Sequence, residues 1–220
     1  MQIALLAAVG YLLGAVPFGL IAGYLFGRTD VRQHGSGNTG MTNVMRTVGV
    51  KAAVLVLVLD MGKCVAAVLI ARALTDSPAA DAAATISAMV GHTWSVYLKF
   101  KGGKGTATGW GGLLVLSPIS GLVATALGVA VVAGTRWVSL GSIVAATVGS
   151  AVLVGLCVTG NAPGPYAWFG IVGAPIIVFR HKDNIRRLMK GEERKLGQKT
   201  PGAAVQAEPR SRGVRWPGSV

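Results

Sequence analysis

The stretch AAVLVLVLDMGKCVAAVLIARA (residues 52–73) indicates the fold class of this chain. A helix needs roughly 20 mainly apolar residues to cross the hydrocarbon core of a bilayer, and this stretch reaches that length. The rest of the 220-residue chain agrees, because 52% of its residues are hydrophobic and 13% are charged. Soluble domains carry roughly twice that share of charge. We therefore predict an all-α, polytopic integral membrane protein.

Further apolar runs lie on both sides of this stretch. They cover residues 3–26, 82–98, 106–116, 119–135, 139–158 and 166–179. We predict seven membrane spans in total. The runs on either side of Pro118 are short and could form one kinked hairpin or a re-entrant pair, so five spans are the alternative. The N-terminus lacks the basic region of a cleavable signal peptide, so the first run is expected to be a span.

Several glycines within these runs are spaced four residues apart. The pairs are Gly10 and Gly14, Gly19 and Gly23, and Gly105 and Gly109. Small residues at this spacing allow helix backbones to approach closely in a membrane, although some such pairs arise by chance. Both cysteines, Cys64 and Cys157, fall inside apolar runs, so we expect them to pack in the bundle and predict neither a disulfide nor a metal site.

The basic residues indicate an orientation for the bundle. The formal net charge is +13, and the connections TDSPAAD (75–81), SPIS (117–120) and TGNAPGP (159–165) contain no lysine or arginine. The basic residues gather in the alternate connections: Arg28, Arg32, Arg46, Lys51, Lys99, Lys101, Lys104, Arg136, Arg180, Lys182, Arg186, Arg187 and Lys190. Because such residues accumulate on the cytoplasmic side, we predict an external N-terminus and a cytoplasmic C-terminus. Residues 1–196 would form the membrane domain, and residues 197–220 a disordered basic tail.

One of the basic connections contains GSGNTG (35–40), which matches the G-x-G-x-x-G pattern of dinucleotide-binding enzymes. Asp60 even follows at roughly the spacing expected for the acidic ribose ligand. That pattern is meaningful only between a strand and a helix of a βαβ unit, and here it follows a membrane helix. We therefore reject the dinucleotide-binding interpretation.

Three basic connections nevertheless share one chemistry. GSGNTGMTNVMR (35–46) and KGGKGT (101–106) are glycine-rich turns that lead into helices, and RHKDNIRR (180–187) follows the last span. Such turns can present backbone N–H groups to an anion at a helix N-terminus. A plain polar turn explains the first connection equally well by itself. Taken together, the three connections indicate one or two phosphate-bearing ligands at the cytoplasmic surface.

SGNTGMTNVMR (36–46), GHTWSVYLKFKGGKGTAT (91–108) and RHKDNIRRLMKGEE (180–193) resemble the three motifs of the bacterial acyl-phosphate:glycerol-3-phosphate acyltransferases. The likeness extends over about residues 1–196. It implies an enzyme of phospholipid biosynthesis that transfers an acyl group from acyl phosphate to the 1-hydroxyl of sn-glycerol 3-phosphate. The products would be lysophosphatidic acid and inorganic phosphate.

The resemblance assigns roles to residues in the three motifs. The expected catalytic residues are Ser36, Lys104, His181 and Asn184. The expected substrate-binding residues are Gly37, Asn38, Gly40, Thr42, Asn43, Arg46, Gly102, Gly103, Gly105, Ser142, Arg187 and Glu193. Glu193 is expected to contact Arg187 or Lys104 rather than substrate. His181 could be a general base, whereas the resemblance favours a phosphate oxygen of the acyl donor as the proton acceptor.

The resemblance also implies partners. We expect acyl phosphate, glycerol 3-phosphate and membrane lipid as ligands, an acyl-phosphate-producing enzyme upstream, and a monomer in the bacterial inner membrane. No cofactor, metal or nucleic acid is expected. A transporter of a phosphorylated solute is the alternative, but it would need polar residues along the whole bundle. A phosphatidyl transferase would need clustered aspartates, whereas only Asp60 lies in a predicted span.

Overall fold

The computed structural model describes residues 1–198, which form helices and turns without any β-strand. The expected tail therefore lies almost entirely outside the described residues. The α-helices are α1 (Gln2–Ala15), α2 (Phe18–Gly27), α3 (Met41–Thr47), α4 (Val50–Leu74), α5 (Pro78–Thr93), α6 (Thr106–Leu116), α7 (Pro118–Thr135), α8 (Val138–Val158), α9 (Ala167–Arg180) and α10 (Lys182–Met189). Three short 3-10 helices, η1 (Val31–Gln33), η2 (Val96–Leu98) and η3 (Gly164–Tyr166), lie in the connections.

Four segments among the described residues are long and apolar enough to span a membrane: Gln2–Gly27, Val50–Leu74, Pro118–Thr135 and Val138–Val158. The predicted count of seven is not confirmed, because α5, α6 and α9 have 16, 11 and 14 residues. The first predicted span is divided into α1 and α2 at Val16–Pro17. Proline explains this break, since it has no N–H to donate and its ring disfavours the preceding helical turn.

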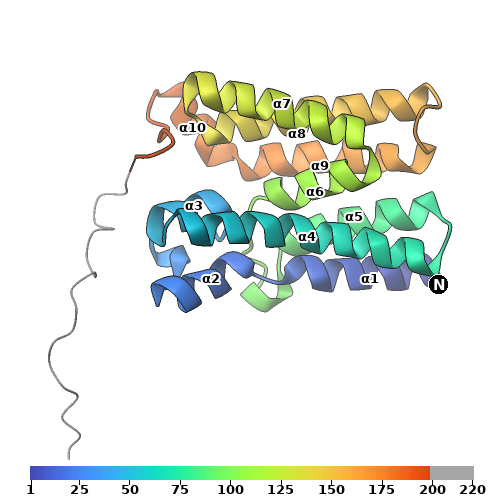
Figure 1. Cartoon of the computed structure of the whole chain (residues 1–220), viewed down its shortest axis with the longest axis horizontal. Coiled ribbons are helices and arrows are strands. Elements are labelled where there is room, and N and C mark those ends of the chain that lie inside the picture. Colours follow the sequence, from blue (N-terminus) through green and yellow to red (C-terminus); the bar gives the residue numbers. More distant parts are fainter. Residues whose placement is uncertain (199–220) are drawn as a thin grey trace, which may run out of the picture.

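The long helices lie side by side in two groups (Figure 1). Helices α1 to α5 form one group, and α7 to α9 form the other. The short helix α6 lies between the groups and contacts both α4 and α7. Helices α3 and α10 lie at the same end of the bundle, here called the site end. The N-terminus lies at the opposite, far end.

The spaced glycines have different roles in the two parts of the first span. A Cβ on Gly10 or Gly14 would lie 2.7 or 2.0 Å from a carbonyl oxygen of α5. This pair therefore permits close helix packing, as predicted. Gly19 instead contacts the carbonyl of Thr39, and Gly23 contacts Val31, so the second pair packs against a loop rather than a helix.

The third predicted glycine pair does not bring two helix backbones together either. Gly105 precedes α6 with a left-handed φ of 81°. A Cβ on Gly109 would approach side chains of Met89 and Ile177 rather than a helix backbone.

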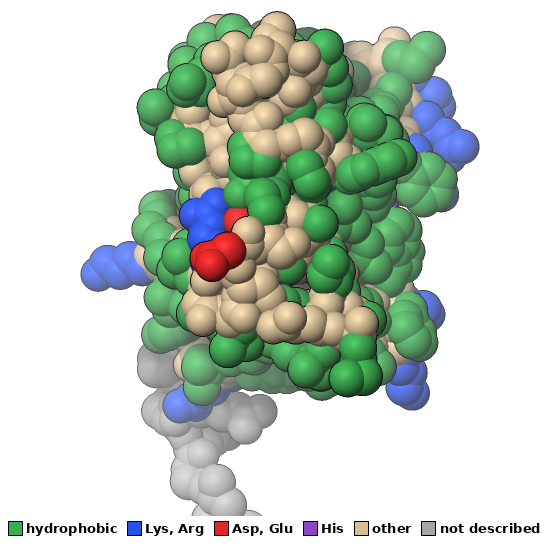
Figure 2. All heavy atoms as spheres, turned by 90° about the vertical axis from the view of Figure 1, so that its right-hand side faces the viewer, with side chains coloured by type: hydrophobic (Ala, Val, Ile, Leu, Met, Phe, Trp, Pro, Cys, Tyr) green, Lys and Arg blue, Asp and Glu red, His purple; other side chains and the backbone are tan. Residues whose placement is uncertain are grey.

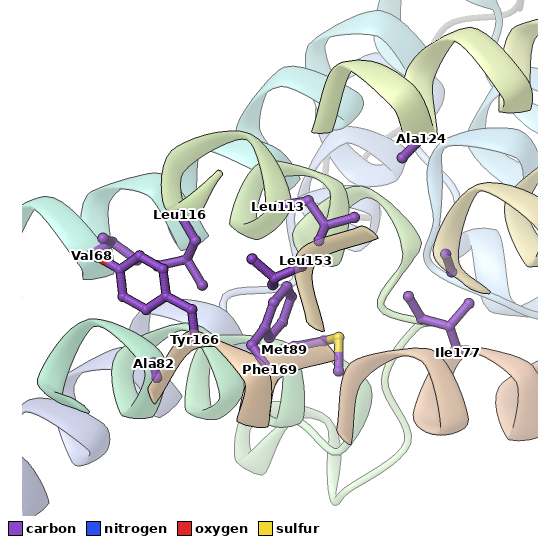
Figure 3. Close-up of a cluster of buried hydrophobic side chains, with 11 residues drawn as sticks. Val68, Ala82, Met89, Leu113, Leu116, Ala124, Leu153, Tyr166, Phe169 and Ile177 are labelled. Carbon is purple, nitrogen blue, oxygen red and sulfur yellow. The ribbon is translucent and has the colours of Figure 1, made fainter. Parts of the chain in front are cut away.

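The core of the bundle lies where α5, α6, α8 and α9 meet (Figure 3). Met89, Leu113, Leu153, Phe169 and Ile177 are all buried there. Helix α6 is too short to span the membrane alone. The close packing of these side chains fixes it against three longer helices, α5, α8 and α9. The core therefore positions the N-terminus of α6 and the loop before it.

A buried ion pair lies near the joint between α1 and α2. Lys63 Nζ is 2.8 Å from Asp60 Oδ1, as expected of opposite charges three residues apart on one helix. The same ammonium group donates to the carbonyl of Val16 at 3.2 Å and lies 2.7 Å from His92 Nδ1. Because an ammonium group has three protons and only donates, these three acceptors satisfy it completely. The pair thus connects α4 with α5 and with the kink at Pro17.

The far end of the bundle contains a charged network that the sequence did not reveal. Arg72, inside the apolar run of α4, lies 2.9 Å from Asp81 of α5. Its guanidinium also donates to the Val115 carbonyl, and the Tyr166 hydroxyl donates to Asp81. In the view of this end in Figure 2, a small group of charged atoms lies left of centre at mid-height, and the centre of the face consists of apolar and uncharged atoms. The network neutralises a basic residue at the far end and joins α4, α5, α6 and η3.

Candidate active site

A cavity of about 770 Å³ extends from the site end into the second group of helices. Its polar part is lined by Ser36, Asn38, Thr42, Asn43, Arg46, Lys104, Thr106, Ser142, His181, Asn184, Arg187, Glu193 and Arg194. Its apolar part is lined by Trp110, Leu113, Ala124, Val129, Val132, Ala145, Phe169 and Ile177. The apolar wall therefore includes part of the core in Figure 3. The cavity can hold a ligand with an anionic head and an apolar chain.

The three predicted segments converge on the polar part. Ser36, Lys104 and His181 all line the same cavity, although they lie far apart in the sequence. A smaller polar pocket of about 140 Å³ adjoins it and is also lined by Ser36, Lys104 and Asn184. The two pockets therefore share one set of polar side chains.

The first loop is held in place by the amide of Asn43. Its Nδ2 lies within 2.7–3.1 Å of the carbonyls of Val31, His34 and Asn38, and its Oδ1 accepts from the Ser36 N–H at 2.9 Å. Asn43 is almost fully buried. These bonds occupy the polar atoms that were predicted to bind substrate, so Asn43 positions Ser36 and Asn38 in the cavity wall.

A chain of hydrogen bonds connects the second and third segments. Lys104 Nζ donates to Asn184 Oδ1, and Asn184 Nδ2 donates to Glu193 Oε1 at 2.6 Å. Glu193 also accepts from Ser139 of α8 at 2.8 Å and pairs with Arg187 at 2.7 Å. The expected contact of Glu193 with Arg187 is therefore present. Because Glu193 can only accept, it fixes the Asn184 amide with its oxygen towards Lys104.

The glycines of the second loop do not form the expected cradle of free N–H groups. Gly102 N–H donates to the Thr93 carbonyl, and Gly103 N–H donates to the His92 carbonyl. Neither glycine lines the cavity, and the carbonyls of both accept from Arg180. A Cβ on Gly103 would lie 2.2 Å from His92 Nε2, so this glycine permits the loop to pack on the imidazole.

In the first loop, one of the predicted backbone donors already has a partner: Gly37 N–H donates to the His34 carbonyl, and Gly37 does not line the cavity. Free N–H groups remain at the cavity in the first turns of two helices, α3 and α6. Gly40 and Thr42 line the wall at the first of these, and Gly105 and Thr106 at the second. The Thr106 hydroxyl is buried there and has no hydrogen-bond partner among the described residues.

His181 lies between α9 and α10 with its ring in the cavity wall. Its Nδ1 is 2.8 Å from the carbonyl of Ile177. A carbonyl only accepts, so Nδ1 carries the proton and Nε2 remains the unprotonated nitrogen. Burial, reinforced by the charge of Lys104, lowers the pKa of His181 to about 4. The ring is therefore neutral at physiological pH.

Positive charge dominates the polar part of the cavity. Among the residues that the structure describes, Asp60 and Glu193 are the acidic groups in its wall, and Asp60 already pairs with Lys63. Glu193 is thus the acidic group that remains to balance the cations of the wall, which include Arg46, Lys104, Arg187 and Arg194. Burial, assisted by the neighbouring arginines, lowers the pKa of Lys104 to about 8. This concentration of cations favours the binding of an anion in the site.

Most of the predicted site residues line the cavity; Gly37, Gly102 and Gly103 do not. Sequence reasoning missed Ser139, Thr106 and Arg180. Ser139 and Thr106 lie in the first turns of apolar helices, where the sequence pattern does not distinguish a functional hydroxyl from a structural one. Their roles became visible only from their surroundings in the fold. Arg180 was counted as an orientation signal, but its guanidinium instead supports the second loop.

The fold and the site together define a helical membrane protein with a cationic pocket that opens into an apolar cavity. A family model described as glycerol-3-phosphate acyltransferase matches residues 4–191. The chain belongs to this family.

Curated relatives and solved structures agree with this assignment. The glycerol-3-phosphate acyltransferase of Rubrobacter xylanophilus is 43% identical over 198 residues, which cover 90% of this chain and 97% of the relative. The glycerol-3-phosphate acyltransferase of Anaeromyxobacter sp. (strain K) is 46% identical, and the match covers 88% of this chain and 96% of the relative.

A solved structure also matches. The crystal structure of PlsY (YgiH), an integral membrane glycerol 3-phosphate acyltransferase in its glycerol 3-phosphate form, matches with a TM-score of 0.82. It is 35% identical, and the match covers 90% of this chain and 96% of that one. The lysophosphatidic acid form gives a TM-score of 0.80.

Proposed function

We propose that this protein transfers an acyl group from an acyl phosphate to the 1-hydroxyl of sn-glycerol 3-phosphate. The reaction would take place at the cytoplasmic face of the bacterial inner membrane, where the basic connections lie under the positive-inside rule. Its products would be lysophosphatidic acid and inorganic phosphate, and a separate enzyme would supply the acyl phosphate. The observation that carries this proposal is the continuity of the cationic pocket with the apolar cavity.

The shape of the site fits both reactants. The apolar part, between α6, α7, α8 and α9, suits the acyl chain of the donor, and its phosphate would lie near the N-terminus of α6. The smaller pocket of about 140 Å³ is polar and suits glycerol 3-phosphate. Lys104 lines both pockets, so its ammonium group can neutralise both phosphates where they approach each other.

The chemistry requires little from the protein beyond positioning and charge. The hydroxyl oxygen of glycerol 3-phosphate attacks the acyl carbonyl carbon, the bond from that carbon to the phosphate oxygen breaks, and inorganic phosphate leaves. Lys104 and Arg46 stabilise the negative charge on the leaving phosphate, while Ser36 and Asn38 orient the donor. The hydroxyl proton passes to a phosphate oxygen of the donor, which departs as hydrogen phosphate.

His181 is better suited to orient the hydroxyl than to remove its proton. Its free Nε2 can accept a hydrogen bond, whereas a pKa of about 4 makes the ring a weak base. We expect His181→Gln to lower kcat/KM by about tenfold, through loss of that hydrogen bond, without changing the shape of the pH profile. Initial rates at pH values from below the pKa of about 4 up to pH 9 check this. Loss of the acidic limb, with a fall of more than a hundredfold, would instead identify His181 as the base.

The pKa of Lys104 predicts a second feature of the pH profile. Because the charged ammonium is the active form, kcat/KM should decrease as the pH rises through about 8. The corresponding decrease in kcat, the alkaline limb of its pH profile, should lie at higher pH, because bound phosphates favour the charged form of Lys104. Lys104→Arg should remove the limb, because guanidinium stays charged. If the wild-type profile is flat to pH 10, or the limb persists in the arginine variant, Lys104 is not its source.

Phosphate release tests the proposed function against the transporter alternative. Purified protein in liposomes is given palmitoyl phosphate, with or without glycerol 3-phosphate, and inorganic phosphate and lysophosphatidic acid are measured. The proposal expects both products in equal amounts, only when glycerol 3-phosphate is present. Uptake of glycerol 3-phosphate into the liposomes without either product would support a transporter and contradict the proposal.

A further inference from the structure

Residues 191–196, which follow α10 and are here called the strap, form part of the wall of the cavity. Trp137 Nε1 donates to the Glu193 carbonyl at 3.1 Å. Leu196 N–H donates to the Arg136 carbonyl at 2.6 Å, and the Arg136 guanidinium donates to the Leu196 carbonyl at 2.8 Å. The backbone is thus fixed on both sides of Arg194 by the turn between α7 and α8.

Arg194 lies next to Arg46 in the cavity wall. Arg46 Nη2 donates to the Arg194 carbonyl at 3.4 Å, and both residues line the cavity. Burial, reinforced by the charge of Arg194, lowers the pKa of Arg46. Two like charges in a partly buried site repel each other unless an anion lies between them.

Both side chains also contain a buried donor without a partner. Arg46 Nε and Arg194 Nη1 are shielded from solvent, and neither has a hydrogen-bond acceptor among the described residues. Buried donors almost always have partners, so a ligand is the expected acceptor. The guanidinium group is well suited to a phosphate, because its N–H groups form a rigid fork.

We infer that Arg194 is a further phosphate-binding residue, and that it and Arg46 hold one phosphate dianion between Arg46 Nε and Arg194 Nη1. This inference rests on the proposed function for the source of the phosphate, which is either glycerol 3-phosphate or the acyl phosphate. Binding by Arg194 would also stabilise the strap once the substrate is present, because its backbone is already fixed at Glu193 and Leu196.

The test compares Arg194→Gln and Arg194→Lys with Arg186→Gln. Arg186 carries the same charge on α10, but its side chain is 75% exposed and makes only a surface pair with Asp183. We expect Arg194→Gln to raise the KM of one substrate by about ten- to a hundredfold, whereas Arg194→Lys should recover part of the affinity. The substrate whose KM changes identifies the phosphate. Arg186→Gln should leave both KM values within twofold of wild type.

A binding measurement separates this inference from the proposed function. Thermal unfolding in detergent is followed with and without inorganic phosphate, and the stabilisation by phosphate should be lost in Arg194→Gln but kept in Arg186→Gln. If wild type has no acyltransferase activity but shows this dependence, the function is wrong and the inference stands. If Arg194→Gln keeps both KM values and the full stabilisation by phosphate, or lowers kcat alone, the inference is wrong.

Discussion

Replacing Lys104 with alanine should lower kcat/KM by about a thousandfold, the upper end of the loss found when one preorganised hydrogen-bond donor is removed from a catalytic site. Lys104 lines both pockets and donates to Asn184. Arg187 also lines both pockets, but it already pairs with Glu193 at 2.7 Å and is therefore not free to replace the charge of Lys104. Without Lys104, two phosphate dianions would have to lie side by side with less compensating charge. The KM of at least one phosphate substrate should rise, and phosphate release measures the turnover.

Lys101→Ala is the matched control for this prediction. Lys101 belongs to the same loop, carries the same charge and is exposed, and it does not line the cavity. The control should retain activity within about twofold, since exposed charges contribute little. If Lys104→Ala binds both substrates normally and turns them over at the rate of the control, the site has been placed wrongly.

Replacing Gly19 with alanine should also reduce activity strongly, although Gly19 touches no substrate. An added Cβ would lie 1.6 Å from the carbonyl oxygen of Thr39, which is backbone and cannot rotate away. The first loop would have to move by more than 1 Å, and with it Ser36 and Asn38. Displacements of that size at a reacting centre can cost about a hundredfold in rate. We expect a loss of this order in kcat/KM.

Gly155→Ala separates the steric effect from a general effect of alanine in a membrane helix. Gly155 lies in α8 with no atom within 4 Å of the added Cβ. Its replacement should preserve activity and slightly raise the unfolding temperature in detergent, because alanine favours the helix by up to about 1 kcal/mol. Equal activities of the two variants would show that Gly19 does not hold the first loop in place.

The apolar runs and the motifs predicted much of the architecture. The helix over Thr106–Leu116 has the predicted bounds, and the ion pair of Asp60 with Lys63 follows from their spacing on α4. The convergence of the three loops followed from their shared charge and their position on one side of the bundle. These features depend on local pattern and on the bilayer, and both can be read from one sequence.

The details that failed depend on contacts between distant segments. The glycine turns appeared to offer free N–H groups, but the carbonyls of His92 and Thr93 accept those of Gly102 and Gly103. The amide of Asn43 was predicted to bind substrate, but it donates to the carbonyls of Val31 and Asn38 in its own loop. None of these hydrogen-bond partners lies at a spacing that a periodic pattern would reveal. The predicted count of seven spans is not confirmed, because helices such as α5, which ends at Thr93, are shorter than the apolar runs that predicted them.

The most direct test of the central claim is a crystal structure of the protein with glycerol 3-phosphate and a ketophosphonate analogue, in which a methylene group replaces the labile oxygen of the acyl phosphate. The account predicts that the two phosphorus atoms lie on either side of Lys104, that of glycerol 3-phosphate in the smaller pocket and that of the analogue near the N-terminus of α6, with the acyl chain between α6 and α9. It also predicts that the 1-hydroxyl faces the ketone carbon. Ligands bound on opposite sides of the bundle, or an acyl chain outside this cavity, would contradict it.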